Sequence, residues 1–392
     1  MSEITEVFGG LGSWRIDLHP DTPKAVTQRL ELAGAGFAQL VVTSVRVDHV
    51  GAGDEIMTAS VYGGVLRRRT GRHQVEGLGL WSAFGDDRGV GPLVGAGLSA
   101  TKSYEQWVTD LDLSPFITAS TSLPTGSVTW TTDRVMTHRE ALEVLQEMVG
   151  AAPFNGLDLH VDHRSMEISS EPPVWGVFAP APYDDPATIP LFVSHHASRD
   201  AGADSDVIRC RFEVAESVEE YVSTAIVGST TSTIGSPRHT YPGGGLDVRQ
   251  EKHIDDPSIP AGSEAAVGAA EIDRHDDPEV VVTCWTDERG LAARVKPGAT
   301  IRLYAPEHGV WDSSNPTAVN GRMTWYVYNW VESMRWPVGP NQGVYVRFDD
   351  DSVLNLSEWY VPSLGEAQVT FGEPMARRVV GGTVQRGLRF AA

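Results

Sequence analysis

Residues 253–312 read HIDDPSIPAGSEAAVGAAEIDRHDDPEVVVTCWTDERGLAARVKPGATIRLYAPEHGVWD, and they contain the clearest pattern in the chain. Ser263 is positioned to cap an Ala-rich helix that ends before Pro278. Several strand-like segments follow, separated by turn residues such as Pro297-Gly298. The stretch predicts a helix packed on the side of a small β-barrel, and it contains no catalytic cluster.

Short strands also dominate the first part of the chain. Alternating or β-branched segments are separated by turn residues, which is typical of an antiparallel barrel or sandwich. The expected strands are 13–19, 37–47, 55–69 and 73–81.

The sequence pattern changes from strand-like to helical near Asp86. Ser103 with Gln106 and Thr137 with Glu140 have the spacing of capping boxes, in which each side chain accepts a hydrogen bond from the other residue's backbone N–H. Each pair precedes a segment with helical periodicity, and two strand-like segments follow the second helix. These features predict a small α/β insertion.

The predicted fold class is mainly β with an α+β insertion: two small β-barrel domains plus a small α/β insertion domain. We expect a first barrel domain from residues 1–85 together with 171–250, and an insertion at 86–170. A helix with a second barrel domain is expected at 251–361. Residues 362–392 have a weak pattern and are predicted to be a C-terminal tail that orders on a partner.

Composition excludes several classes of protein. The chain has 392 residues, 40 Gly, 24 Pro and a formal net charge of −21. That charge argues against binding to nucleic acid or to an anionic membrane surface, because both require a basic face. The start of the chain has no features of a signal peptide, and no apolar stretch approaches the ~20 residues of a membrane span. Cys210 and Cys284 match no metal-ligand spacing and are expected to be free, buried thiols of a protein made in the cytoplasm.

Motifs that could carry chemistry have simpler explanations. GVGPLVGAG (89–97) lacks the strand–helix context of a phosphate loop, and the histidines of HVDH (160–163) point to opposite faces of a strand. The acidic run 349–351 fits a hairpin turn better than a calcium loop. We therefore predict no enzyme activity, no catalytic residue, no metal and no cofactor.

One basic cluster contrasts with the acidic chain. Arg67, Arg68, Arg69 and Arg72 lie at the end of a predicted hairpin. They are either a solvated hairpin tip or a subunit interface whose guanidinium groups bind carboxylates of a neighbouring copy. We take these four arginines as the candidate subunit interface.

The order of several segments resembles the hub (minor tail) proteins at the tail tip of long, non-contractile-tailed bacteriophages. The matching segments lie within residues 10–360 and include SWRIDLHPDTP, YGGVLRRRTGRHQVEGLGLW, THREALEVLQEMVGA and VKPGATIRLYAPEHG. Only Lys24, Lys102, Lys252 and Lys296 are lysines among 31 basic residues, which is typical of GC-rich coding, so a high-GC actinobacterial host is expected.

The resemblance implies a structural virion protein with two similar barrels per subunit and a homotrimer of pseudo-six-fold symmetry. Such a trimer would adapt the hexameric ring of a distal tail protein to a three-fold central fibre. Its other expected partners are the tape measure protein and further minor tail proteins. The net charge of −21 separately suggests that acidic residues line the lumen, so that viral DNA would pass through without specific binding. No membrane contact is expected.

Three other functions remain open from the sequence, and one of them, a spike-like subunit of a bacterial secretion device, would share the fold. A tail-associated cell-wall hydrolase would use exposed aromatic residues such as Trp311, Trp325 and Trp336, although barrel core and interface anchoring explain these tryptophans better. A peripheral receptor-binding tail protein would instead bind host cells in isolation.

Overall fold

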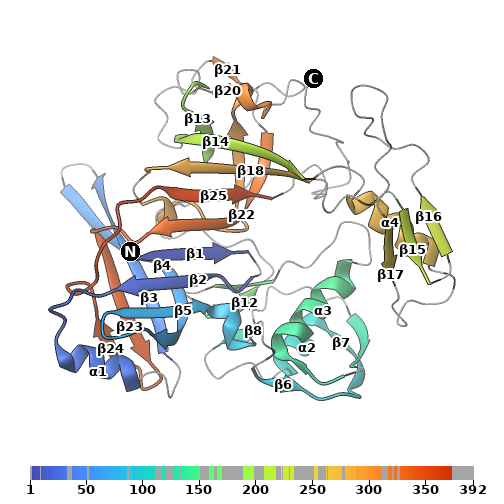
Figure 1. The fold of residues 1–392 in the computed structure, drawn as a ribbon, viewed down its shortest axis with the longest axis horizontal. Helices are drawn as coiled ribbons and strands as arrows, with labels where there is room; N and C mark the ends of the chain where they lie inside the picture. Colours follow the sequence, from blue (N-terminus) through green and yellow to red (C-terminus); the bar gives the residue numbers. More distant parts are fainter. Residues whose placement is uncertain are drawn as a thin grey trace. The chain divides into compact units, whose positions relative to one another are not determined.

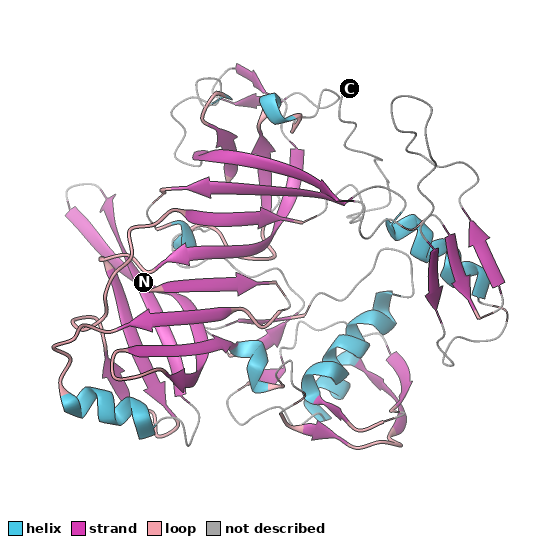
Figure 2. Ribbon diagram, in the orientation of Figure 1, coloured by secondary structure: helices cyan, strands magenta, loops and turns pink. Residues whose placement is uncertain are grey.

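The computed structural model describes residues 2–8, 10–32, 38–50, 53–85, 89, 91–110, 117–119, 127–132, 134–150, 159–162, 166–169, 189–197, 207–217, 222, 224–228, 230–233, 251–254, 262, 264–275, 279–288, 290–310, 317–319, 322–324 and 327–372. These residues are mostly in strands, with few helices (Figure 2). The chain divides into two compact units: residues 1–212 with 283–392, and residues 213–282. The predicted mainly β fold is confirmed.

One 13-stranded sheet organises the larger unit. At one end its strands close into a ring, because β19 pairs with β22 as well as with β13. The strands of this closed barrel, in ring order, are β19 (Thr300–Tyr304), β13 (Leu191–Ser194), β14 (Val207–Ser217), β18 (Glu279–Thr286), β25 (Ala367–Phe371) and β22 (Val327–Pro337).

Aromatic side chains fill part of the barrel. Phe192 and Phe371 meet edge to face with ring centroids 5.1 Å apart, and Phe212 stacks on Phe371. Ile208 pairs in register with Phe192 on the same face, so the alternation of β14 places one row of apolar side chains inside the ring.

The other strands extend the sheet beyond β22 as an open sheet (Figure 1). Its strands follow in the order β1 (Glu3–Val7), β2 (Ser13–Asp17), β5 (Gln74–Gly79), β4 (Gly53–Arg69), β3 (Ala38–Val50), β23 (Gln342–Phe348) and β24 (Val353–Asn355). Alternation along these strands buries one row of residues, including Ile4, Trp14, Ile16 and Val75. Helix α1 (Lys24–Leu32) connects β2 to β3.

The expected α/β insertion has its own hydrophobic core. Trp81, Trp107, Trp130 and Leu142 are among its buried residues, and Trp107 meets Trp130 edge to face. Its elements are η2 (Leu80–Ala83), β6 (Leu93–Val94), β7 (Ser99–Ser103), α2 (Tyr104–Asp110), β8 (Thr118–Ala119), β9 (Ser127–Thr131), β10 (Met136–Thr137), α3 (His138–Gly150), β11 (His160–Asp162) and β12 (Glu167–Ser169).

The smaller unit contains β15 (Thr224–Val227), β16 (Thr230–Thr233), β17 (Glu251–Ile254) and α4 (Glu264–His275). Strand β15 pairs with β16 and β17, and α4 packs on β15 and β16 through Ile272 and Ala225. The sequence predicts that this helix packs on the side of a β-barrel, and within the smaller unit its described partners are strands of a three-stranded sheet. Local periodicity identifies the apolar face of a helix but not the sheet that covers it.

The structure differs from the sequence-based predictions in three further places. Strands β13 and β14 join the same ring as β18, β19 and β22, although the sequence assigns them to different barrels. The segment AARVK (292–296) has a strand-like pattern, but Leu291–Ala293 form a 3-10 helix, η4, which follows Gly290 with φ +79°. Residues Ala367–Phe371 of the predicted tail form β25, whereas residues 373–392 lie outside the described residues.

Three short elements complete the larger unit: η5 (Pro306–His308), β20 (Thr317–Val319) and β21 (Arg322–Thr324). Strands β20 and β21 form a separate hairpin.

Candidate assembly surface

The arginine cluster lies where β4 turns into β5. Thr70 N–H donates to the Gln74 carbonyl at 2.9 Å, and Gly71 adopts φ +65° in the turn. A residue without a Cβ adopts this left-handed conformation without strain. The local sequence thus fixes a tight hairpin, as predicted, with Arg72 at its tip.

The four arginines of the cluster have different environments. The Arg69 side chain is only 12% exposed, pairs with Glu31 and donates to the Thr27 carbonyl at 3.1 Å. It therefore holds α1 against the sheet. Arg67 lies at the irregularity between Leu66 and Arg68 in the β4–β5 pairing, and it donates to the Ser82 carbonyl.

Arg67, Arg68 and Arg72 are exposed. Arg68 pairs in register with Glu76 of β5. The candidate interface of four arginines thus narrows to two, because Arg67 and Arg69 already bind backbone and side-chain groups of their own chain.

Arg68 is the end of a row of alternating charges that crosses the sheet. Cross-strand register pairs Glu76 with Arg15 and Arg15 with Glu3, and Arg335 Nη2 lies 2.6 Å from Glu3 Oε2. We call Arg335, Glu3, Arg15, Glu76 and Arg68 the charged row. It runs from β22 to β4 on the face opposite the buried Ile4 and Trp14. Exposed pairs of this kind contribute little stability each, about 0–1 kcal/mol.

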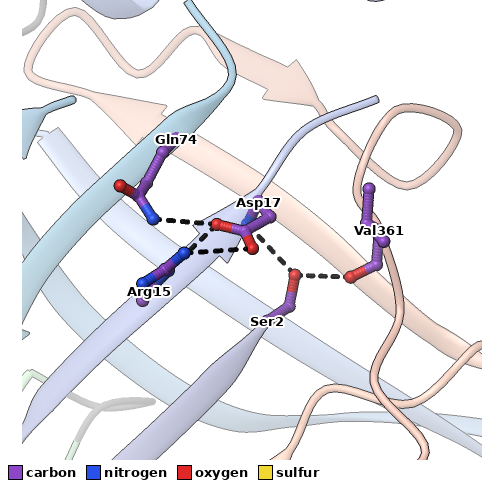
Figure 3. A network of polar contacts seen from close by, with 5 residues as sticks. All are labelled: Ser2, Arg15, Asp17, Gln74 and Val361. Atoms are coloured by element: carbon purple, nitrogen blue, oxygen red, sulfur yellow. Dashed lines mark hydrogen bonds and ion pairs between the residues drawn. The ribbon is translucent and has the colours of Figure 1, made fainter. Parts of the chain in front are cut away.

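A polar network flanks the charged row at Asp17 (Figure 3). Asp17 accepts hydrogen bonds from Arg15 Nε and Gln74 Nε2, both at 3.0 Å, and its backbone N–H donates to Ser2 Oγ at 3.1 Å. Ser2 Oγ in turn donates to the Val361 carbonyl at 2.6 Å.

This network changes the acidity of Asp17. Partial burial raises the pKa of the Asp17 carboxyl, but hydrogen bonds from Arg15 and Gln74 outweigh it and lower the pKa from 3.8 to about 2. The same contacts raise the pKa of Arg15, first through its hydrogen bond to Asp17 and also through Glu76 and Glu3. Asp17 and Arg15 are therefore both charged at neutral pH.

A largely buried ion pair lies where the closed barrel meets the open sheet. Lys296 Nζ is 2.9 Å from Glu6 Oε1, and the two side chains are only 12% and 13% exposed. Trp336 Nε1 donates to the same Glu6 oxygen at 2.8 Å, and Lys296 also donates to the Val61 carbonyl. Because Glu6 is on β1, Trp336 on β22 and Val61 on β4, the pair fixes three strands and the loop before β19.

The acidic run 349–351 occupies the β23–β24 turn, as predicted. Asp351 adopts φ +60°, and Asp350 accepts a hydrogen bond from the Ser352 backbone N–H at 2.9 Å. Hydrogen bonds from Ser352 lower the pKa of Asp350. Among the described residues, no group of three or more His, Cys, Asp or Glu side chains is arranged to hold a metal ion. Within the same residues, no helix has the length and apolarity to cross a membrane.

Sequence reasoning missed the charged row and the buried pair. The only local signal for the row is the Arg15-x-Asp17 and Gln74-x-Glu76 spacing, which places polar side chains on one face of each strand. Lys296 and Glu6 are far apart in the chain, and only the fold brings them together.

No family model matches the chain, and no curated protein matches it significantly. Among solved structures, the chain is similar to a tail protein from Neisseria meningitidis MC58, with a TM-score of 0.45, 10% identity and coverage of 95% of this chain and 92% of that chain. A 43 kDa tail protein of prophage MuSo2 from Shewanella oneidensis gives a TM-score of 0.41 and 8% identity over 96% of this chain and 93% of that one. A prophage tail protein from Listeria monocytogenes EGD-e gives 0.40 and 8% over 95% and 87%. Likeness at this level does not establish a family.

Proposed function

We propose that this chain is a structural protein of a bacteriophage tail and that three copies form the hub of the tail tip. In this role it joins a hexameric ring above to a three-fold fibre below, and acidic residues line the channel through which DNA leaves. Its virion location and its contacts with the distal tail and tape measure proteins are parts of the same proposal. The order of sequence segments from SWRIDLHPDTP to VKPGATIRLYAPEHG supports it.

One structural observation carries the mechanical part of the proposal. A single hydrogen-bonded sheet runs from the closed barrel to the short edge strand β24, and β22 belongs to both parts. A continuous hydrogen-bonded sheet of this kind suits a protein that transmits load between rings. Closure of one end of the sheet also removes strand edges that would otherwise pair nonspecifically.

Arg68 and Arg72 supply the proposed contact between copies. Guanidinium groups bind carboxylates in two-pronged geometry, and an acidic chain with net charge −21 offers many carboxylates to a second copy. The contact is therefore between the hairpin tip of one copy and an acidic surface of the next.

The decisive experiment combines light scattering with charge reversal. The purified chain is expected to have the mass of a trimer, and Arg68→Glu with Arg72→Glu to have the mass of a monomer with an unchanged circular dichroism spectrum. A matched control reverses Arg134 and Arg347, whose side chains are 67% and 52% exposed elsewhere. A monomeric unmodified chain rejects the trimer, and a trimeric double variant rejects the arginine contact.

Two further measurements separate the other tail functions. Clearing of host cell wall in a zymogram contradicts the structural role, and binding of the isolated chain to host cells indicates a peripheral receptor-binding protein. Immunogold labelling at the tail tip, with no labelling along the tube, is the expected location.

A further inference from the structure

Two buried thiols lie on neighbouring strands of the closed barrel. Cys210 is on β14 and Cys284 on β18, and both side chains are 0% exposed. Both cysteines are free, as the sequence predicts. No part of the proposed tail function uses them.

The two thiols influence each other. The Cys284 side chain helps to raise the pKa of the Cys210 thiol, and Cys210 Sγ donates to the Ile208 carbonyl at 3.4 Å. Adjacent strands hold facing Cα atoms about 4.5–5.5 Å apart, which lies within the range that a disulfide spans. Because β14 and β18 are hydrogen-bonded neighbours, the spacing of their backbones is compatible with an S–S bond.

The position of the pair in the chain gives the bond a consequence. The smaller unit comprises residues 213–282, so the chain leaves the larger unit just after Cys210 and returns just before Cys284. A bond between the two sulfurs would close a loop that contains the whole smaller unit. Loop closure of this kind removes conformational freedom from the unfolded chain and stabilises the fold.

We propose that Cys210 and Cys284 are a latent disulfide that clamps β14 to β18 when the protein meets a two-electron oxidant of the diazene or disulfide class. Two S–H bonds break and one S–S bond forms. With a diazene, the two electrons and two protons pass to the N=N bond and give a hydrazine. This inference does not depend on the proposed tail function.

Burial also explains why the two thiols stay reduced until a strong oxidant is present. Burial is the largest cause that raises the pKa of the Cys210 thiol, and the Cys284 side chain adds to it. A protonated, covered thiol attacks oxidants slowly, because the thiolate is the nucleophile. Once formed, the S–S bond is equally covered against reducing thiols, so it should persist.

To test this, the folded chain is treated with diamide just below its unfolding temperature. It is then unfolded in guanidinium, its remaining free thiols are alkylated with iodoacetamide, and its intact mass is measured. We expect a product that is lighter by two hydrogens and carries no alkyl group, with an unfolding midpoint several degrees higher that dithiothreitol reverses. Trypsin cleavage between the two cysteines should leave one band on a non-reducing gel and two after reduction. Alkylation of both thiols, or an oxidant adduct on one, overturns the proposal.

A second experiment tests whether a lack of oxidation only reflects that the oxidant cannot reach the buried thiols in the folded chain. The chain is unfolded in guanidinium and refolded in a glutathione buffer that contains both redox forms, where the sulfurs are free to react. The proposal is overturned if only the molecules with two free thiols regain the native circular dichroism spectrum and the disulfide-bonded molecules do not. Cys210→Ala and Cys284→Ala are matched controls, and the midpoint of each is expected to be the same with and without diamide.

Discussion

At the scale of single residues, two glycines make room for one tryptophan. Trp14 is buried on β2, and Cβ atoms added at Gly64 and Gly77 would lie 2.6 Å and 2.4 Å from its indole. A Cβ at Gly77 would also lie 2.0 Å from the Val65 carbonyl oxygen. The close approach of this ring to β4 and β5 therefore depends on both glycines.

Gly77→Ala should destabilise the fold by about 1–3 kcal/mol, because the backbone of β5 must shift to accept the methyl group. Urea unfolding measures the loss. Gly95→Ala is the control, since a Cβ there meets nothing within 4 Å. An equal loss in both variants would mean that general glycine effects, not the packing of Trp14, set the cost.

The lowered pKa of Asp17 makes the stability of the fold depend on pH in a specific way. The pKa of this carboxyl in the folded chain is about 2 against an ordinary 3.8, so the unfolded chain takes up the proton first as the pH falls. The stabilisation is complete above pH 4 and disappears as the pH falls toward 2. A shift of this size corresponds to at most about 2 kcal/mol.

Asp17→Asn should therefore unfold at lower urea concentration at pH 7, and its deficit against the unmodified chain should shrink between pH 4 and pH 2. Asp21→Asn, at a side chain that is 85% exposed, should leave the curve unchanged. If the stability difference between Asp17→Asn and the unmodified chain is constant over this pH range, packing and not the charge of Asp17 causes it.

At the scale of elements, local chemistry was predictable and long-range pairing was not. Both capping boxes form as the spacing predicts: Ser103 N–H donates to Gln106 Oε1 at 3.1 Å, and Thr137 N–H donates to Glu140 Oε2 at 2.7 Å. In contrast, β25 pairs with β22 although no nearby residue signals it. Sequence patterns report a segment's own periodicity, whereas partners along a sheet are chosen by packing of the whole chain.

The candidate site shows the same limit. The sequence located the arginine hairpin but did not separate Arg68 from Arg69, because one strand position decides which guanidinium meets α1. That contact is made by Thr27 and Glu31, which no local rule connects to β4.

The buried pair between elements gives a third prediction. Lys296→Met leaves the Glu6 carboxylate in a site that is 13% exposed without its cation, and such losses cost about 3–5 kcal/mol. A double variant with Glu6→Leu should recover much of that loss, because no uncompensated charge remains. Thermal unfolding of both single variants and the double variant measures the coupling. If the losses add without recovery, the pair acts only through hydrogen bonds to other groups.

At the scale of the whole molecule, barrel closure depends on a strand late in the chain. Ala367, Val369 and Phe371 of β25 are buried, and β25 joins β18 to β22 in the ring. Without it, two strands would each present unpaired backbone groups, which is a template for aggregation.

A chain that ends at Gly365 should consequently aggregate and lose the near-ultraviolet signal of its packed aromatic residues. A chain that ends at Gly372 keeps β25 and should stay soluble with an unchanged unfolding midpoint. Size-exclusion chromatography and circular dichroism distinguish them. A soluble, cooperatively unfolding shorter chain would show that the ring is dispensable.

Strand β22 has a mechanical consequence of its own. Residues 327–330 pair with β19, and residues 333–337 pair with β1, so one strand passes from the ring to the open sheet. A pull along this strand loads both rows of backbone hydrogen bonds in shear, where the bonds must break together instead of one after another. Tension entering at one end of the sheet is thus spread over many bonds before any single one yields.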